Sequence, residues 1–235
     1  MDFLKLREFH LKQAVQRIKS SFRREEILLE CISSISDIEV VANTLSVRLR
    51  HWAENYFPEA CRTVSDEELA LFLVENKNLK SDGMGAEIDK KDFSALQTLA
   101  SIFNCVFEKK RKLEEYLSLL AKEVCPNLSA LLGAMLAAKL VALAGCLQRL
   151  SRLPASTIQV LGASNAMLKH IQSGAKPPKH GLIFSHPFIN KAPRTEQGRR
   201  ARAFAAKIAI AARVDFFGGK YVGSELLKKV EARFR

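Results

Sequence analysis

Two heptad patterns in the first 124 residues constrain the fold of this chain most strongly. Apolar side chains recur at spacings of three and four over residues 28–52, and the same spacing returns over residues 96–120, where only Lys110 interrupts it. Such a repeat keeps one apolar seam on one face of a helix. The two helices are predicted to fold back on each other as a long antiparallel coiled coil, although two amphipathic helices of an ordinary bundle differ little in energy.

The predicted boundaries of these helices follow from helix-stop and helix-start signals. One long helix is expected from residue 4 to about 56, because the residue before Pro58 is pushed out of helical geometry. Ser65 and Glu68 have the spacing of a capping box, which predicts a short second helix. The polar, glycine-containing stretch 75–87 predicts a loop at the hairpin tip, and the third helix is expected to begin near Asp89.

Cys125-Pro126 marks the predicted boundary between a helical coiled-coil domain, residues 1–124, and a compact second domain, residues 125–235. Asn127 or Ser129 is expected to cap a helix over 128–150, whose many small residues imply close packing. Further helices are expected at 156–161, 164–172, 199–214 and 224–233. The sequence therefore predicts an all-α protein.

Charge is distributed unevenly along the chain. Residues 149–235 contain 17 Lys+Arg and 4 Asp+Glu, whereas the first 148 residues contain 20 and 21. A partner with negative charge is expected to meet the C-terminal part, and nucleic acid is the leading candidate. An acidic membrane surface is the alternative, but no segment shows the bulky apolar face that membrane binding needs.

The predicted helix at 199–214 carries much of this charge. Arg199, Arg202 and Arg213 fall within roughly 60° of one another around a helix, and Arg200 and Lys207 flank them. Apolar residues occupy the opposite side. The pattern indicates either a nucleic-acid contact or a solvated basic face on a core helix.

A proline-stiffened loop precedes this helix. It contains Lys176, Lys179, His180 and, shortly after, His186-Pro187. Lysines can meet phosphates, and a histidine or Phe184 can stack on an unpaired base. Lone histidines are also common as hydrogen-bonding loop residues.

Five motifs carry a family resemblance: Pro126-Asn127-Leu128, Ala144-Gly145, LPASTIQVLGA, AKPPKHGLIFSHPFI and ARAFAAKIAIAARVD. They resemble the Nop domain of the archaeal and eukaryotic core proteins of box C/D small ribonucleoproteins and of a related spliceosomal protein. The resemblance covers roughly residues 125–235, and LSVRLRHWAENYFPE at 45–59 looks like the coiled-coil region of the same family.

The resemblance implies a non-catalytic RNA-binding scaffold. Family proteins bind a composite surface made by kink-turn RNA and a small ribosomal-protein-like partner, and they support guide-directed RNA 2'-O-methylation in rRNA processing. No cofactor, metal site or membrane association is expected. The expected location is the cytoplasm of an archaeon, or the nucleolus of a eukaryotic cell.

The resemblance also implies pairing with itself or a paralogue through the coiled coil, for which we expect Leu45, Leu49, Leu113 and Leu117 to be important. The chain begins close to the coiled coil, so the family's fibrillarin-binding N-terminal domain is expected to be missing and fibrillarin recruitment is doubtful. An alternative function is therefore a dimerisation or decoy module that pairs with a full-length paralogue without recruiting the methyltransferase.

The resemblance places the ribonucleoprotein contact at three segments. The first is the helix start at 162–169, the second is the loop with the histidines, and the third is the basic helix. The residues carried over are Gly162, Ala163, Asn165, Lys169, Lys176, Lys179, His180, His186, Arg199, Arg200, Arg202 and Lys207.

Overall fold

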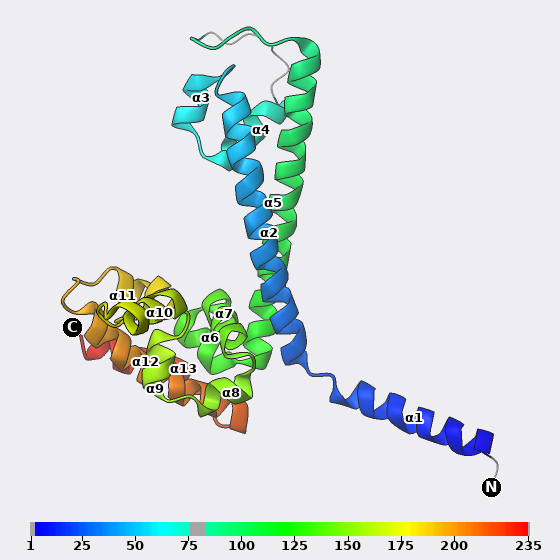
Figure 1. Ribbon diagram of the computed structural model, residues 1–235, viewed down its shortest axis with the longest axis vertical. Helices are drawn as coiled ribbons and strands as arrows, with labels where there is room; N and C mark the ends of the chain where they lie inside the picture. Colours follow the sequence, from blue (N-terminus) through cyan, green and yellow to red (C-terminus); the bar gives the residue numbers. More distant parts are fainter. Residues whose placement is uncertain (1–2, 76–82, 235) are drawn as a thin grey trace. The chain divides into compact units, whose positions relative to one another are not determined.

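The computed structural model describes residues 3–75 and 83–234, and within them all regular structure is helical, as predicted (Figure 1). The helices of the first half are α1 (Phe3–Ser21), α2 (Arg24–Ala53), α3 (Pro58–Thr63), α4 (Asp66–Glu75) and α5 (Lys90–Val124). Those of the second half are α6 (Pro126–Leu132), α7 (Ala134–Ala144), α8 (Leu147–Arg152), α9 (Ala155–Val160), α10 (Ser164–Ser173), the 3-10 turn η1 (Leu182–Ser185), α11 (Pro187–Asn190), α12 (Gln197–Phe217) and α13 (Gly223–Ala232). The chain divides into two compact units, residues 33–116 and residues 1–32 with 117–235.

The single long helix predicted for residues 4 to 56 is wrong, because the chain leaves helical geometry at Phe22 and Arg23. The hydroxyl groups of Ser20 and Ser21 donate hydrogen bonds to Arg17 O and Ile18 O, at 3.0 and 2.8 Å. Such bonds compete with the backbone ladder and favour a helix end.

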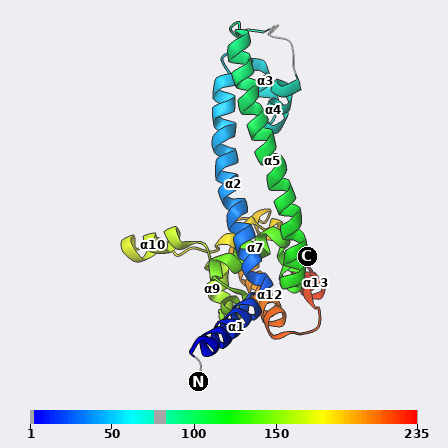
Figure 2. The ribbon, with the colours of Figure 1, turned by 90° about the vertical axis from the view of Figure 1, so that its right-hand side faces the viewer.

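The unit at residues 33–116 is built on the two long helices, which lie side by side in both views (Figures 1 and 2). The seam predicted from the heptads lies in its core, where Leu49, Leu96 and Phe103 are buried. Lys110, the polar residue in the seam, is paired with Glu39 of α2 and Glu114 of α5, both at 3.7 Å. This pairing offsets the cost of placing a cation in the apolar seam.

Two short helices, α3 and α4, complete this unit. The predicted capping box is confirmed: Ser65 N donates to Glu68 Oε2 at 2.9 Å, and Glu68 N lies 3.4 Å from Ser65 Oγ. Arg50 of α2 joins them by hydrogen bonds to Asp66 and to the carbonyl oxygens of Cys61 and Val64. Part of the predicted tip loop, residues 76–82, lies outside the described residues.

In the other unit, the predicted helix over 128–150 is three helices rather than one. The backbone takes a positive φ of 81° at Gly133 and of 92° at Gly145, and an α-helix cannot continue through either conformation. The chain bends by 117° between α6 and α7. No single helix in the described residues is long and apolar enough to cross a membrane; α6 and α7 qualify together, by length and composition only.

The cap predicted for this segment is also wrong. Cys125 is the N-cap of α6 and makes no side-chain capping bond. Asp215 of α12 performs this role instead, accepting hydrogen bonds from Asn127 N at 3.0 Å and from Leu128 N at 2.9 Å. Asn127 Oδ1 accepts from Val222 N and Gly223 N, at 2.7 and 2.8 Å.

Helix α12 is the central element of this unit. It packs against α6, α8, α9 and α13, and its buried side consists of Phe204, Ile208 and five alanines, as its pattern predicted. The small alanines allow neighbouring helices to approach closely. The helix is longer than the predicted range 199–214, because it continues to Phe217 and ends at Gly218, which has a left-handed φ of 75°.

Candidate nucleic-acid interface

One side of α12 presents cations to solvent. Arg199, Arg202 and Arg213 are exposed, and Lys207 is half-buried beside them. The guanidinium of Arg213 is oriented by a hydrogen bond from Nε to Ser151 O at 3.2 Å, and that of Arg199 lies 5.5 Å from the ring centre of Phe234. The fold thus holds three arginines on one solvent-facing stripe.

Arg200 has a different environment from the other arginines. Its guanidinium bonds to Glu196 Oε2 at 3.0 Å and to Phe188 O at 3.4 Å. The same group lies 5.2 and 5.4 Å from the ring centres of Phe188 and Phe234. Because its cation is already paired and stacked, Arg200 contributes to packing in this structure, and its predicted RNA contact stays a prediction.

Helix α10 has no buried residue, and Figure 2 shows it projecting away from α7, α9 and α12. Ala163 is its N-cap, and Asn165 and Lys169 are exposed on it. Two of its apolar side chains, Leu168 and Ile171, are also exposed, at 52% and 73%. The helix therefore offers both polar and apolar side chains to a partner.

Gly162 sets the direction in which the chain enters α10. Its φ is +87°, and a Cβ there would lie 3.1 Å from Leu143 Cδ1 and 3.2 Å from Leu182 Cβ. A glycine is required by both the backbone conformation and the close contact. Gly162 thus has a structural role, and its predicted ribonucleoprotein contact stays a prediction.

The loop that follows α10 is tied to α9 by backbone and side-chain bonds. Gly181 N donates to Gln159 O at 2.8 Å, Leu182 N to Leu161 O at 2.7 Å, and Gln159 Nε2 to Lys179 O at 2.7 Å. A Cβ at Gly181 would lie 2.0 Å from Leu161 O. The loop therefore holds the exposed side chains of Lys176 and Lys179 on a fixed backbone.

The ring of His180 stacks on that of Phe184, with centroids 4.2 Å apart and planes 11° apart. The sequence suggested either ring as a platform for an unpaired base, and the structure brings the two together, so one face of each is occupied by the other. Burial, and the charge of Lys179, hold the pKa of His180 below its usual value.

His186 is half-buried and already makes two contacts within the chain. Its ring lies 4.7 Å from that of Phe204, tilted by 34°, and its Nδ1 accepts a hydrogen bond from Phe188 N at 3.3 Å at the start of α11. Burial lowers the pKa of His186, opposed by the charge of Glu231. These contacts give His186 a packing role, and base stacking by its ring stays a prediction.

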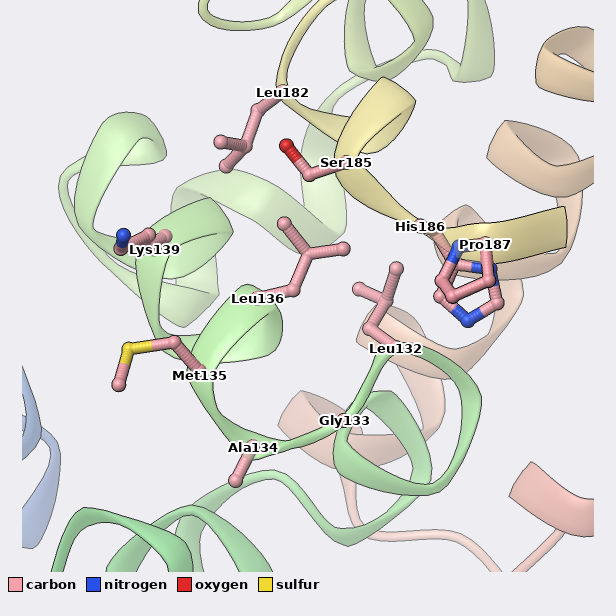
Figure 3. A pocket seen from close by; sticks show the side chains of 10 residues that line it. All are labelled: Leu132, Gly133, Ala134, Met135, Leu136, Lys139, Leu182, Ser185, His186 and Pro187. Atoms are coloured by element: carbon pink, nitrogen blue, oxygen red, sulfur yellow. The ribbon is translucent and has the colours of Figure 1, made fainter. Parts of the chain in front are cut away.

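A cavity of about 300 Å³ lies beside His186, between α6–α7 and η1–α11 (Figure 3). Leu132, Leu136 and Leu182 form apolar walls, and Ser185 and Lys139 supply polar groups. A mostly apolar hollow with a few polar groups is the usual character of a ligand site. The cavity lies where the loop that carries His180 and His186 packs against α6 and α7.

The residues predicted for dimerisation lie mainly inside one chain. Leu49 and Leu117 are fully buried, and Leu45 and Leu113 are half-buried. Other apolar residues of α2 are exposed, among them Val40 and Val47 at 66% and 63%. A groove of about 550 Å³ follows them and is lined by Val40, Asn43, Thr44, Val47, Arg48 and His51.

Two features of this interface were missed in the sequence. The first is the pairing of Asp215 with Asn127, which joins positions 88 residues apart and has no local signal. The second is the exposed aromatic pair Phe217 and Tyr221, to which the sequence pattern assigned no role. Among the described residues, no group of three or more His, Cys, Asp or Glu side chains could hold a metal ion.

Residues 67–235 match the model of the Nop family, whose description reads "snoRNA binding domain, fibrillarin". The chain is 35% identical over 258 residues to an uncharacterized NOP5 family protein of Methanocaldococcus jannaschii, which covers 99% of this chain and 62% of the relative. It is 30% identical over 257 residues to nucleolar protein 56 of Homo sapiens, covering 95% of this chain and 43% of the relative.

A solved structure, the crystal structure of a fibrillarin/NOP5p complex, is also similar. The TM-score is 0.60 at 27% sequence identity, over 99% of this chain and 77% of that chain. The chain therefore spans roughly two fifths to three fifths of the length of the two relatives described above.

Proposed function

The chain belongs to the Nop family, and from this premise we propose that it is a non-catalytic scaffold that binds kink-turn RNA together with a small ribosomal-protein-like partner in a box C/D-type ribonucleoprotein. In that setting it supports guide-directed RNA 2'-O-methylation. The domain responsible is residues 125–235, with the preceding coiled coil as a separate assembly element.

The exposed arginine stripe on α12 is the observation that carries this proposal. Arg199 and Arg202 lie on a helix whose opposite side is fully packed, so the fold fixes their spacing. The lysine loop lies against the first turn of this helix, since a Cβ at Gly198 would be 3.8 Å from Lys179 Cβ. Cations from two segments thus gather at one place, where phosphate groups bind.

Helix α10 supports the composite nature of the target. Its exposed Leu168 and Ile171 suit contact with a protein, while Asn165 and Lys169 suit contact with RNA. RNA alone gives apolar side chains little to bind, so the complex of RNA and protein is the better ligand for this helix. We therefore propose that α10 contacts both components.

A gel-shift experiment with kink-turn RNA tests the proposal. We expect strong binding when the small partner protein is present and much weaker binding to the RNA alone. Lys169→Ala and Arg202→Ala are expected to weaken the ternary complex, whereas Lys109→Ala, on the exposed surface of α5, serves as a matched control. Failure to bind with and without the partner would refute the proposed function.

A second candidate function, pairing with a second copy or a paralogue, is favoured by the exposed apolar residues along the outer face of α2. Val40 and Val47 are both exposed and lie one heptad apart, with Thr44 between them in the groove. Because Leu49 and Leu117 are buried within the chain, we propose this outer face as the pairing surface instead.

Recruitment of fibrillarin distinguishes the two candidate functions in a pull-down. A scaffold of the methyltransferase complex retains fibrillarin, and a decoy module that pairs with a full-length paralogue does not. Retention of fibrillarin by this chain supports the scaffold, and its absence from the pull-down supports the decoy module. Direct binding of fibrillarin to the isolated chain would overturn the decoy function.

A further inference from the structure

The exposed stripe of α12 continues beyond its arginines. At 100° per residue, Arg199, Arg202, Ile210, Arg213 and Phe217 all fall within about 80° around the helix. All five are exposed. The stripe runs for about 27 Å, given 1.5 Å per residue, so the proposed interface covers only its first part.

The far end of this stripe is aromatic. Phe217 is 71% exposed, and Tyr221, four residues later, is 57% exposed. Lys220 between them is exposed as well. The ring of Phe217 has an edge contact with Phe216, with centroids 4.9 Å apart and planes at 78°, which restrains its orientation and leaves most of its surface in solvent.

The backbone that carries these aromatic residues is firmly held. Gly218 N and Gly219 N both donate to Val214 O at 3.1 Å, closing the helix with a tight turn. The residue after Tyr221 is anchored through Val222 N to Asn127 Oδ1 at 2.7 Å. The residue two before Phe217, Asp215, is bonded to Asn127 as well. Both aromatic residues therefore belong to a preorganised segment, so little backbone entropy is lost on binding.

We propose that Phe217, Lys220 and Tyr221 form a stacking platform for unpaired RNA nucleotides at the C-terminal end of α12. Aromatic rings stack on bases, and neighbouring cations attract the phosphates that connect them. The platform rests on the proposed RNA-binding function and extends it, since Arg213 links it to the arginines at the other end of the helix. Its target is a single-stranded segment rather than the kink-turn itself.

The charge pattern favours RNA over a protein as the occupant. Between residues 197 and 222, Asp215 is the one carboxylate in the sequence, and its oxygens are occupied by Asn127 and Leu128. The exposed apolar side chains are flanked by Arg213 and Lys220. The nearest carboxylate after Tyr221, Glu225, is paired with Lys229 at 2.6 Å. The excess of cations around the exposed rings favours single-stranded RNA as the occupant.

Fluorescence anisotropy on the full chain tests the platform with an unstructured, pyrimidine-rich RNA oligonucleotide. A length of about 12 nucleotides is comparable to the site sizes of single-strand-binding proteins. Phe217→Ala and Tyr221→Ala are each expected to weaken binding about 5- to 150-fold, the equivalent of roughly 1–3 kcal/mol per stacked base. Tyr221→Phe is expected to retain binding. Phe9→Ala, which removes an exposed ring from α1, is the matched control and is expected to have no effect.

Phe217→Leu separates stacking from simple apolar contact, since it keeps an apolar side chain and loses the ring. Loss of binding in this variant supports the platform, and full retention would point to a protein-type apolar contact and contradict it. No measurable affinity of the wild-type chain for the oligonucleotide would also overturn the inference. The kink-turn gel shift reports on the proposed function separately, because that RNA is bound with its partner protein and needs no single-stranded segment.

Discussion

Asp215 Oδ1 lies 2.7 Å from Asn127 Nδ2 and 3.0 Å from Asn127 N, so one carboxylate on α12 holds the start of α6. Asn127 in turn holds the start of α13 through Val222 and Gly223. Three helices therefore meet at this pair. Burial raises the pKa of Asp215, and the N–H donors of Leu128 and Asn127 oppose that rise.

Asp215→Asn is expected to lower the free energy of unfolding by about 1–3 kcal/mol, because an amide NH₂ group cannot accept from the N–H groups of Asn127 and Leu128. Denaturant unfolding followed by circular dichroism measures the change. Asp37→Asn, at an exposed position of α2, is the control and is expected to change stability little. Equal stability of the two variants would show that the pair contributes no net stabilisation.

Acidification is expected to destabilise the fold through the two half-buried loop histidines, His180 and His186. The pKa of His180 and that of His186 are both lowered by burial, so the unfolded chain takes up protons first as pH falls below about 6.5. Stability from these groups is complete above that pH and is lost as the pH falls through their folded pKa values.

Melting temperatures between neutral and mildly acidic pH test this expectation. His186→Phe keeps the ring contact with Phe204 and cannot take up a proton, so it is expected to reduce the pH dependence, and the double variant with His180→Phe to reduce it further. His10→Phe, at an exposed position of α1, is the control. A wild-type melting temperature that does not fall with pH would contradict the assignment.

Gly181→Ala is expected to disrupt the loop that carries Lys176 and Lys179, because its Cβ would overlap Leu161 O. Gly174→Ala is the matched comparison: its φ is +65° but no atom lies within 4 Å of the added Cβ, so only backbone strain of about 1–2 kcal/mol is expected. Melting curves measure stability, and gel shifts measure binding of the kink-turn complex. If Gly181→Ala lowers the melting temperature and the binding no more than Gly174→Ala does, the loop can shift away from Leu161 O.

Two variants of α2 are expected to separate folding from pairing. Leu49→Ala removes a fully buried side chain and is expected to cost about 2–5 kcal/mol of stability. Val47→Asp places a charge on the exposed face and is expected to reduce the mass measured by light scattering while leaving the melting curve nearly unchanged. A chain that keeps its mass with Val47→Asp would exclude the outer face of α2 as the pairing surface.

The fold was largely predictable because its signals are local. Heptads, Pro58, the Ser65–Glu68 box and the alternation of alanines and arginines on α12 each act within a few turns of helix. The wrong predictions concern features that depend on tertiary packing. Gly133 and Gly145 are compatible with a helix in isolation, and only packing selects the positive φ that breaks it. Likewise the Asn127 side chain is of a type that caps helices, but its Oδ1 accepts a hydrogen bond from Val222 N, 95 residues away.

The candidate interface was predicted in part, for the same reason. Periodicity placed Arg199 and Arg202 on one face of α12, and both are exposed. It could not tell that Arg200 would be paired with Glu196 and stacked on Phe188, or that His186 would pack on Phe204. Those outcomes depend on where α11 and the C-terminal residues fold back, which no local pattern specifies.

The affinity for the complex of kink-turn RNA and its partner protein, measured from about 50 to 200 mM salt, tests the central claim most directly. We expect the logarithm of affinity to fall linearly with the logarithm of salt. Arg202→Ala is expected to reduce the slope by about 0.9 if the contacted RNA is duplex, or about 0.7 if it is single-stranded, and Lys109→Ala to leave it unchanged. An affinity independent of salt, or an Arg202→Ala slope equal to that of the wild type, would contradict the assignment of the α12 stripe as the phosphate-binding surface.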